Sequence, residues 1–187
     1  MTAQTQTAAP PFELLERLKT FLSFDDADAE NLRSMAAIVG RHGPAITDAF
    51  YVRLAANPKT APLIEGRVDA LKGTHRAWMA SLTSGDYGPD YLTSRWRIGL
   101  AHVRVGLEPW WVESVMSFIR TSMLEALAKE LADPAELARK HNSFVKVCDL
   151  DLLIINLSYG EDRLARITEF TGMKRALLEN IIRLPKK

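Results

Sequence analysis

Glycines and prolines stand between the apolar stretches of this sequence and seldom inside them. From residue 12 onward, apolar side chains recur every three or four positions, whereas the strict alternation typical of strands is rare. Proline at the first position of a stretch and glycine just past its end are the usual boundaries of helices. We therefore predict seven or eight helices joined by short loops. With 47% apolar residues, they should pack on one another as an all-α domain.

The predicted helices follow these boundaries along the chain. They cover residues 12–22, 25–39, 44–56, 65–84, 89–105, 109–132, 134–171 and 174–183, with breaks that include Gly40, Gly106 and Gly172. We expect residues 1–11 to be a mobile tail and residues 12–172 to be one domain. Residues 173–187 should then be an extension that leads to a further module or to the chain end.

The charge balance excludes several classes of function. There are 24 Lys and Arg against 23 Asp and Glu, a net charge of +1, which gives no electrostatic case for binding nucleic acid or an anionic membrane.

Cys148 is the single cysteine, so an intramolecular disulfide or a cysteine-rich metal cluster is excluded. No secretion signal is visible, and the longest apolar stretch is too short for a membrane helix. We expect a soluble, cytoplasmic protein.

His102 is the first candidate for chemistry. The four histidines lack the spacing of a zinc site, but one imidazole is enough to hold haem. On its predicted helix, His102 shares a face with Ile98, Gly99, Val105 and Gly106, and the glycines would allow a flat macrocycle to approach closely. The spacing alone also fits a half-buried histidine whose ring bonds to a backbone carbonyl.

Two other predicted helices carry polar groups among apolar ones. Leu71, His75 and Trp78 share one face of the helix over 65–84, with Thr74 beside that face. Tyr51 follows Phe50 on the preceding helix. A phenol and a hydroxyl in such surroundings could donate hydrogen bonds to a small ligand on iron. The alternative for Tyr51 is a rim residue whose hydroxyl faces water.

Several motifs together resemble a known family. They are "SFDDADAENL", "AFYVRL", "VDALKGTHRAW", "RIGLAHVRVGLEPWW" and "DLDLLIINLSYGEDRL". The chain from about residue 12 to 170 resembles the sensor-globin domain of globin-coupled sensors, which is related to the protoglobins. The most specific motif is the histidine followed by x-Arg-branched-Gly-Leu and a helix opened by proline. The resemblance implies a globin-like fold with an extra N-terminal helix and a long C-terminal helix.

The resemblance also implies roles for individual residues. His102 would be the proximal ligand of the iron in haem b (iron protoporphyrin IX), and Tyr51 the distal hydrogen-bond donor. Thr74 and Leu71 would lie on the distal side, and His75 would point toward the haem edge or solvent. Trp78, Ile98 and Val105 complete the expected haem contacts. Val112 departs from the family pattern, since some members carry a tyrosine there, and this puts any signalling through that hydroxyl in doubt.

The function implied by the resemblance is a haem-based oxygen sensor in signal transduction, not an enzyme. Carbon monoxide and nitric oxide are expected to bind as well. A homodimer should form through the last two long helices, because the apolar run from Leu150 to Ile167 is wider than one domain needs, and an output domain or partner should receive the signal. One alternative is a non-haem globin-like module of a stress-signalling complex. The other is a haem enzyme such as a nitric oxide dioxygenase or a peroxidase.

Overall fold

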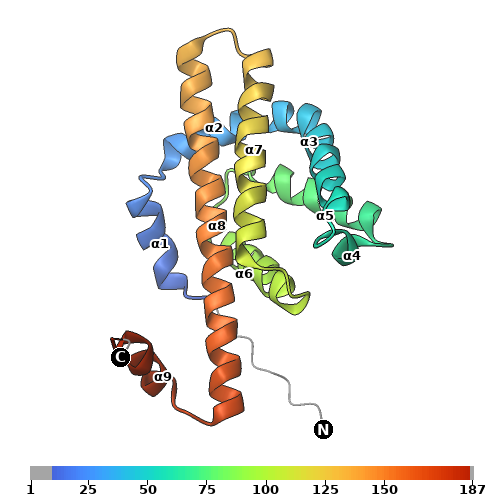
Figure 1. The fold of residues 1–187 in the computed structure, drawn as a ribbon. Helices are drawn as coiled ribbons and strands as arrows, with labels where there is room; N and C mark the ends of the chain where they lie inside the picture. The colour runs from blue at the N-terminus through green and yellow to red at the C-terminus, as the bar shows by residue number, and fades with distance from the viewer. Residues whose placement is uncertain (1–9, 186–187) are drawn as a thin grey trace.

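A computed structural model describes residues 10–185, so most of the predicted N-terminal tail lies outside the described residues. Within residues 10–185 the chain forms nine α-helices and no strand (Figure 1). The helices are α1 (Phe12–Phe21), α2 (Asp26–Ser34), α3 (Ala36–Ala56), α4 (Ala61–Ile64), α5 (Val68–Ser81), α6 (Pro89–Arg104), α7 (Pro109–Glu130), α8 (Pro134–Thr171) and α9 (Arg175–Arg183).

Most helix starts lie where the sequence predicted them. The Asp25 carboxylate caps α2, and the Asp28 carboxylate accepts a hydrogen bond from the Asp25 N–H in return, which completes a capping box. Pro89, Pro109 and Pro134 are the first residues of α6, α7 and α8. Proline suits this position because its missing N–H would have no partner inside the helix.

The predicted break at Gly40 is wrong. Helix α2 ends earlier, before the fully buried Met35, and α3 then runs without interruption through Gly40 and Pro44. Pro44 cannot donate to the Gly40 carbonyl, which normally weakens a helix. The helix continues because side chains on both sides of the missing bond are anchored in the core, namely Ile38, Val39, Ile46 and Thr47.

The short helix α4 is also absent from the prediction, which placed a loop after Asn57. Its start is held by the buried Thr60, whose hydroxyl donates to the Leu54 carbonyl at 2.6 Å across the end of α3. This bond ties α4 to the last turn of α3, and one side chain of α4, Ile64, is buried.

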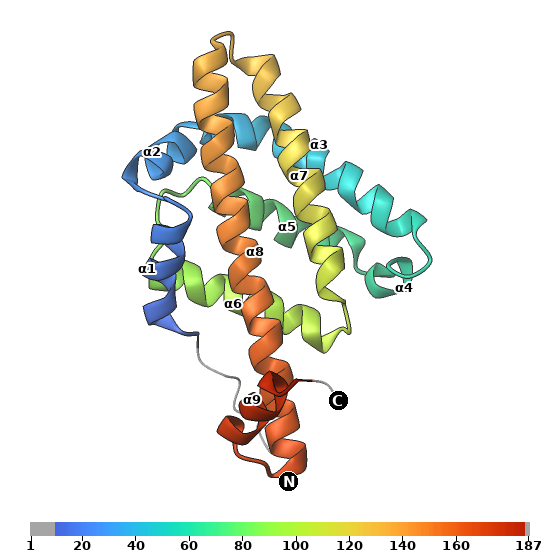
Figure 2. The ribbon, with the colours of Figure 1, turned by 60° about the vertical axis from the view of Figure 1, so that its left-hand side comes forward.

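Helix α8 runs the length of the molecule, and α7 packs antiparallel beside its N-terminal part (Figures 1 and 2). Helix α6 crosses α8, and α3 packs on α5 and α7, so that α3, α5, α6 and α7 surround one space beside α8. Helices α1 and α2 cover the opposite side and pack on α6 and α8 respectively. The largest fully buried side chains include Trp96, Phe144, Leu32, Met35, Met79, Leu82, Ile119, Met123 and Leu150.

A buried carboxylate joins three of these helices. Asp151 on α8 is fully buried and accepts hydrogen bonds from the Arg95 guanidinium at 3.0 Å, from the Trp78 indole at 2.6 Å and from the Tyr91 hydroxyl. The Arg95 guanidinium also donates to the Ser81 hydroxyl at 2.7 Å. Burial raises the pKa of the Asp151 carboxyl, and the Arg95 charge opposes that shift. Because the ion pair has its donors and acceptors satisfied, it fixes the relative positions of α5, α6 and α8.

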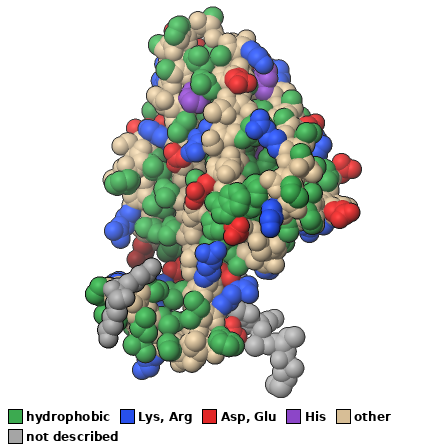
Figure 3. Space-filling view, in the orientation of Figure 1, with side chains coloured by type: hydrophobic (Ala, Val, Ile, Leu, Met, Phe, Trp, Pro, Cys, Tyr) green, Lys and Arg blue, Asp and Glu red, His purple; other side chains and the backbone are tan. Residues whose placement is uncertain are grey.

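The C-terminal end of α8 extends beyond the other helices, and α9 folds back against it (Figure 2). Gly172 ends α8 in the left-handed conformation with φ of 68°. The Arg175 guanidinium then binds the Glu161 carboxylate at 2.7 Å, and Leu178 is the buried side chain of α9. Other apolar side chains of α9, namely Leu177, Ile181 and Ile182, are exposed and form part of an apolar surface over this helix (Figure 3). No helix within residues 10–185 has the length and apolar character needed to cross a membrane.

Candidate functional site

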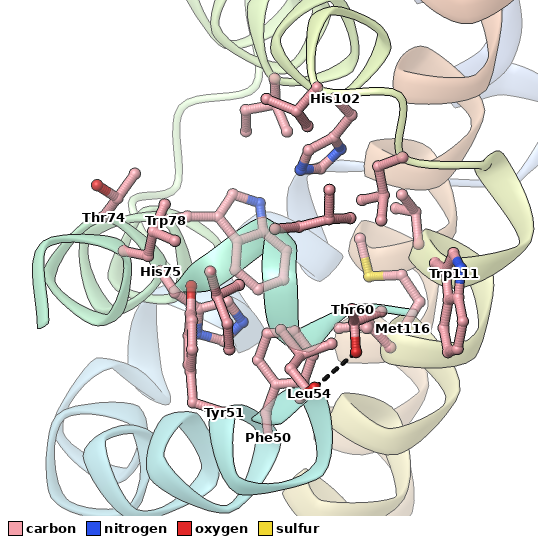
Figure 4. A pocket seen from close by; sticks show the side chains of 18 of the residues that line it. Phe50, Tyr51, Leu54, Thr60, Thr74, His75, Trp78, His102, Trp111 and Met116 are labelled. Carbon is pink, nitrogen blue, oxygen red and sulfur yellow. Dashed lines mark hydrogen bonds between the residues drawn. The ribbon is translucent and has the colours of Figure 1, made fainter. Parts of the chain in front are cut away.

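A cavity lies in the space enclosed by α3, α4, α5, α6 and α7 (Figure 4). All seven residues predicted to contact a cofactor line it: His102, Tyr51, Leu71, Thr74, Trp78, Ile98 and Val105. Most of the other lining residues are apolar, including Phe50, Leu54, Ile64, Leu107, Trp111, Val112, Val115, Met116, Ile119 and Ile155. The structure thus brings together the seven predicted residues, which lie up to 54 positions apart in the sequence, from Tyr51 to Val105.

His102 projects from the last turn of α6 into this cavity (Figure 4). The turn is closed by a Schellman motif, in which Gly106 N–H donates to the Val103 carbonyl and Leu107 N–H to the His102 carbonyl, both at 3.0 Å. Gly106 has φ of 69°, a conformation that glycine adopts without strain. The Tyr159 hydroxyl on α8 donates to the Leu107 carbonyl at 2.9 Å, so α8 holds the segment that follows the histidine.

The His102 ring is buried and incompletely bonded. Its Nδ1 is buried without a hydrogen-bond partner. A hydrogen bond from this nitrogen to a backbone carbonyl, the structural alternative for His102, is therefore not present. Burial lowers the pKa of the His102 imidazole to about 4, so the ring is neutral at pH 7. A neutral imidazole in an apolar cavity has the protonation state that a metal ligand requires.

The predicted role of Gly99 beside a macrocycle is wrong. A side chain at Gly99 would meet the Ile155 carbonyl at 2.7 Å and the Ser158 side chain, both on α8. Gly99 therefore permits α6 to approach α8 closely and does not face the cavity. The cavity side of α6 is formed by Ile98, His102 and Val105.

Tyr51 is buried in the wall that α3 contributes, with 7% of its surface exposed. Its ring packs edge-on against Phe50 at 5.0 Å between centroids, and its hydroxyl makes no hydrogen bond within residues 10–185. Burial raises the pKa of the Tyr51 phenol to about 12, so the hydroxyl keeps its proton at neutral pH. The side chain of Tyr51 is thus largely buried in the cavity wall, and its hydroxyl is a donor without an acceptor among the described residues.

Thr74 and His75 both line the cavity, but His75 lies deeper in it than Thr74. Thr74 is exposed at the edge of the cavity, and its hydroxyl donates to the Ala70 carbonyl of its own helix at 3.1 Å. The His75 ring lies inside, stacked obliquely between Phe50 and Trp78 at 5.1 Å from each (Figure 4). Of the two expected orientations of His75, the haem edge or solvent, the structure has the ring on the cavity wall and not turned to solvent. The face shared by Leu71, His75 and Trp78 is the one that lines the cavity.

One nitrogen of His75 is anchored and the other is not. Nδ1 lies 2.9 Å from the hydroxyl of the fully buried Thr47, whereas Nε2 is buried without a partner. Burial also lowers the pKa of the His75 imidazole to about 4. The cavity therefore contains two neutral imidazoles, from α5 and α6, each with one buried nitrogen that the protein leaves unsatisfied.

These residues fit a haem group better than a bare metal ion. Within residues 10–185, no three His, Cys, Asp or Glu side chains come together as a metal cluster. Haem iron needs only one or two axial ligands, and its flat apolar ring suits a cavity lined by aliphatic and aromatic side chains. The cavity volume of about 240 Å³ lies below the usual range for ligand pockets of about 300–1,000 Å³. Partly exposed wall residues such as Leu63 and Val105 would have to turn outward around a porphyrin.

Sequence reasoning missed several lining residues. Trp111 follows the helix start at Pro109 and stacks on Trp110 with centroids 3.9 Å apart. Arg67 is the residue just before α5, and it also lines the cavity. No pattern in one sequence marks a loop residue as part of a cavity, because its position depends on how α4 packs. Val112 is buried in the wall, so the position noted as a departure from the family pattern does face the site.

Comparisons with known proteins agree with this architecture. The protoglobin family profile matches residues 13–165. The chain is 30% identical over 122 residues to the heme-based aerotactic transducer HemAT of Halobacterium salinarum. That match covers 62% of this chain and 25% of the transducer, so the matched region spans about a quarter of that relative's length.

Two solved structures share the fold. The globin domain of the Geobacter sulfurreducens globin-coupled sensor superposes with a TM-score of 0.74 at 32% identity, over 77% of this chain and 96% of that one. The globin domain of E. coli DosC superposes with a TM-score of 0.67 at 14% identity, over 78% and 99%. The second likeness shows the fold alone, whereas the family match covers most of the sequence. The predicted all-α globin fold is confirmed, and the chain belongs to the protoglobin family as a sensor-globin domain.

Proposed function

We propose that this protein binds haem b and senses oxygen, with carbon monoxide and nitric oxide as further ligands. The observation that carries the proposal is the pair of neutral imidazoles that enter one apolar cavity with unsatisfied buried nitrogens. Buried polar atoms without partners are rare in folded proteins, and a group bound in the cavity would account for these two. The aerotactic transducer named above is heme-based, which supports the same cofactor here. Ferrous haem supplies the reversible binding of the gas.

The absorption spectrum of the purified protein tests this proposal. After reconstitution with haem, we expect a Soret band at one haem per chain that changes on reduction and again on exposure to oxygen. A protein that takes up no haem would instead be a non-haem globin-like interaction module. Two of the relatives named above are a transducer and a globin-coupled sensor, so a sensor is favoured over a haem enzyme such as a nitric oxide dioxygenase.

In this proposal His102 is the proximal ligand. Its ring leaves the end of α6 at a point that the Schellman motif and Tyr159 hold in place. Tyr159 belongs to α8, the helix that leads toward the C-terminus. A shift of the segment after His102 would therefore act directly on α8 through this hydrogen bond. This contact offers a route for the signal that does not need a hydroxyl at position 112.

Tyr51 is the distal donor in this proposal, and its removal gives a first prediction. A bound oxygen carries partial negative charge, and a hydrogen bond to such a group contributes about 1.5–3 kcal/mol. Tyr51→Phe should therefore speed oxygen dissociation roughly tenfold or more, as measured by stopped-flow release. Tyr87→Phe is a matched control, since that buried hydroxyl bonds to the Leu82 carbonyl and does not line the cavity. An unchanged rate in Tyr51→Phe would exclude the tyrosine as donor.

His75 is the second candidate for the distal side. Because Nδ1 is anchored on Thr47 at 2.9 Å, Nε2 is directed away from α3 and is free to bind. If Nδ1 carries the proton and donates it to the Thr47 oxygen, Nε2 presents a lone pair, which is the usual arrangement of a metal-ligating histidine. We therefore propose that Nε2 of His75 would hold the haem iron together with His102 while no gas is bound, and that Tyr51 would donate a hydrogen bond to a bound gas.

Assembly gives a second prediction. We propose a two-fold symmetric homodimer in which α7 and α8 of two copies form a four-helix bundle, with an output domain or partner as recipient of the signal. Helices α7 and α8 lie side by side with no other helix in front of them in Figure 1. Leu124, Leu153 and Ile167 leave 37–47% of their surface exposed on these helices.

Light scattering at micromolar concentration should give twice the chain mass of 20.9 kDa. Leu124→Glu with Leu153→Glu should give a monomer, because two carboxylates would be buried in the interface. Val52→Glu is the control, since Val52 is 67% exposed on α3. A monomeric parent protein, or a double variant that remains dimeric, would contradict this interface.

A further inference from the structure

One charged side chain lines the otherwise neutral cavity. Of the described lining residues, only Arg67 carries a formal charge at pH 7, because burial keeps His75 and His102 neutral. Arg67 is exposed, so its guanidinium lies at the mouth of the cavity and not in its interior. The charge is thus placed where an apolar cavity meets water.

The local backbone fixes this position. Gly66 has φ of 71° and turns the chain between α4 and α5, so that Arg67 becomes the N-cap residue of α5. One guanidinium nitrogen donates to the Leu63 carbonyl at 3.0 Å. Arg67, Leu71 and Thr74 are spaced by four and three residues along α5 and all line the cavity, so they form one edge of its opening.

Arg67 also lacks the partner that neighbouring arginines have. Arg76 on the same helix binds the Asp48 carboxylate at 2.9 Å, and the Arg53 guanidinium lies 4.3 Å from the centre of the Phe118 ring. No carboxylate within residues 10–185 lies within ion-pair distance of Arg67. Its remaining N–H donors are therefore available to an anion at the mouth.

We propose that Arg67 binds a propionate carboxylate of the haem. This inference rests on the proposed function, because it concerns the same cavity. Haem is apolar except for its two carboxylates, and a carboxylate cannot enter an apolar cavity without a charged partner. The carboxylates must therefore lie at the opening, where Arg67 presents the planar donor pair that matches a carboxylate. The exposed Thr74 hydroxyl, two turns along the same edge, is the nearest further polar group of α5 on this rim.

Haem loss measures this contact without reference to gas sensing. The protein is loaded with haem, mixed with an excess of apomyoglobin, and the transfer is followed in the Soret region. Arg67→Ala should lose haem about three- to tenfold faster than the parent, the effect typical of one charge-assisted contact near the surface. Arg67→Lys should fall between them, because an ammonium keeps the charge but not the planar donor pair. Arg76→Ala, a charge removal on the same helix outside the cavity, should match the parent.

A second arm separates the carboxylate contact from side-chain packing. Haem dimethyl ester has the same ring and iron but no carboxylate charge. With the ester, Arg67→Ala and the parent should release the group at the same rate. Equal rates with ordinary haem would overturn the proposal, as would an equal acceleration with haem and with its ester. Failure of every variant and the parent to bind haem would instead overturn the proposed function.

Discussion

His102→Ala is expected to abolish stable haem uptake, the largest effect of any single substitution in this protein. The imidazole would supply the axial bond from α6, and no other described residue of α6 that lines the cavity is able to ligate iron. Loss of a residue that merely supports a metal ligand typically weakens binding about 10–100-fold, and loss of the ligand itself should weaken it at least as much. The measurement is a haem titration followed at the Soret band, which should reach one haem per chain only in the parent.

Added imidazole should restore the spectrum of the His102→Ala protein, because the small ligand enters the space that the side chain leaves. His42→Ala is the matched control, since His42 pairs with Glu130 at 2.8 Å on the surface and does not line the cavity. Retention of the parental spectrum and stoichiometry by His102→Ala would show that another residue holds the iron. If His75 then proved to be the sole ligand, the proximal and distal sides of the cavity would have to be exchanged.

The helical architecture could be predicted from the sequence because its determinants are local. Pro89, Pro109 and Pro134 each open a helix, and Gly106 and Gly172 each follow one, so three of the longest helices could be placed almost to the residue. These residues act through their own backbone conformation, which does not depend on the rest of the fold. The fold class follows from the same boundaries together with the apolar periodicity between them.

The same local rules failed where tertiary packing decides the outcome. Pro44 should open a helix, but buried neighbours on both sides carry α3 through it. Gly99 appeared to face a cofactor, yet the close approach of α8 explains it. No pattern in the sequence marks Asp151, although it is the centre of the buried network with Arg95. Each of these outcomes depends on residues more than 30 positions away, or on a face that one helix alone cannot identify.

The distal side of the cavity shows most clearly how far a sequence pattern can predict the position of a side chain. Periodicity along α5 placed His75 on the face shared with Leu71 and Trp78, whereas the resemblance placed Thr74 toward the ligand. In the structure His75 lies inside the cavity and Thr74 at its edge. Helical spacing alone indicates which of the two side chains lies deeper, because a residue one position along a helix is rotated by about 100°.

His75→Leu gives the second large effect that we expect. With Nε2 of His75 as an axial ligand, the ferrous protein without gas should show the low-spin spectrum of six-coordinate haem. Leucine fills a similar volume but has no lone pair, so the variant should show the five-coordinate, high-spin spectrum. Oxygen should also bind faster to the variant, because no side chain has to leave the iron first. Absorption spectra of both reduced proteins, and the rate of oxygen binding by flash photolysis or rapid mixing, measure the two changes.

Thr47→Val separates ligation by His75 from a general effect on the cavity. Thr47 is fully buried and touches Nδ1 of His75 at 2.9 Å, so valine removes the anchor of the ring and keeps its volume. If Nε2 binds iron, this variant should shift the reduced spectrum part of the way toward the five-coordinate form, since an unanchored imidazole is a weaker ligand. Tyr51→Phe should leave coordination unchanged and alter only oxygen release. A parent protein that is already five-coordinate when reduced would exclude His75 as a ligand. His75 would then be a neutral hydrogen-bond donor beside Tyr51, and its replacement by leucine would speed oxygen release instead of oxygen binding.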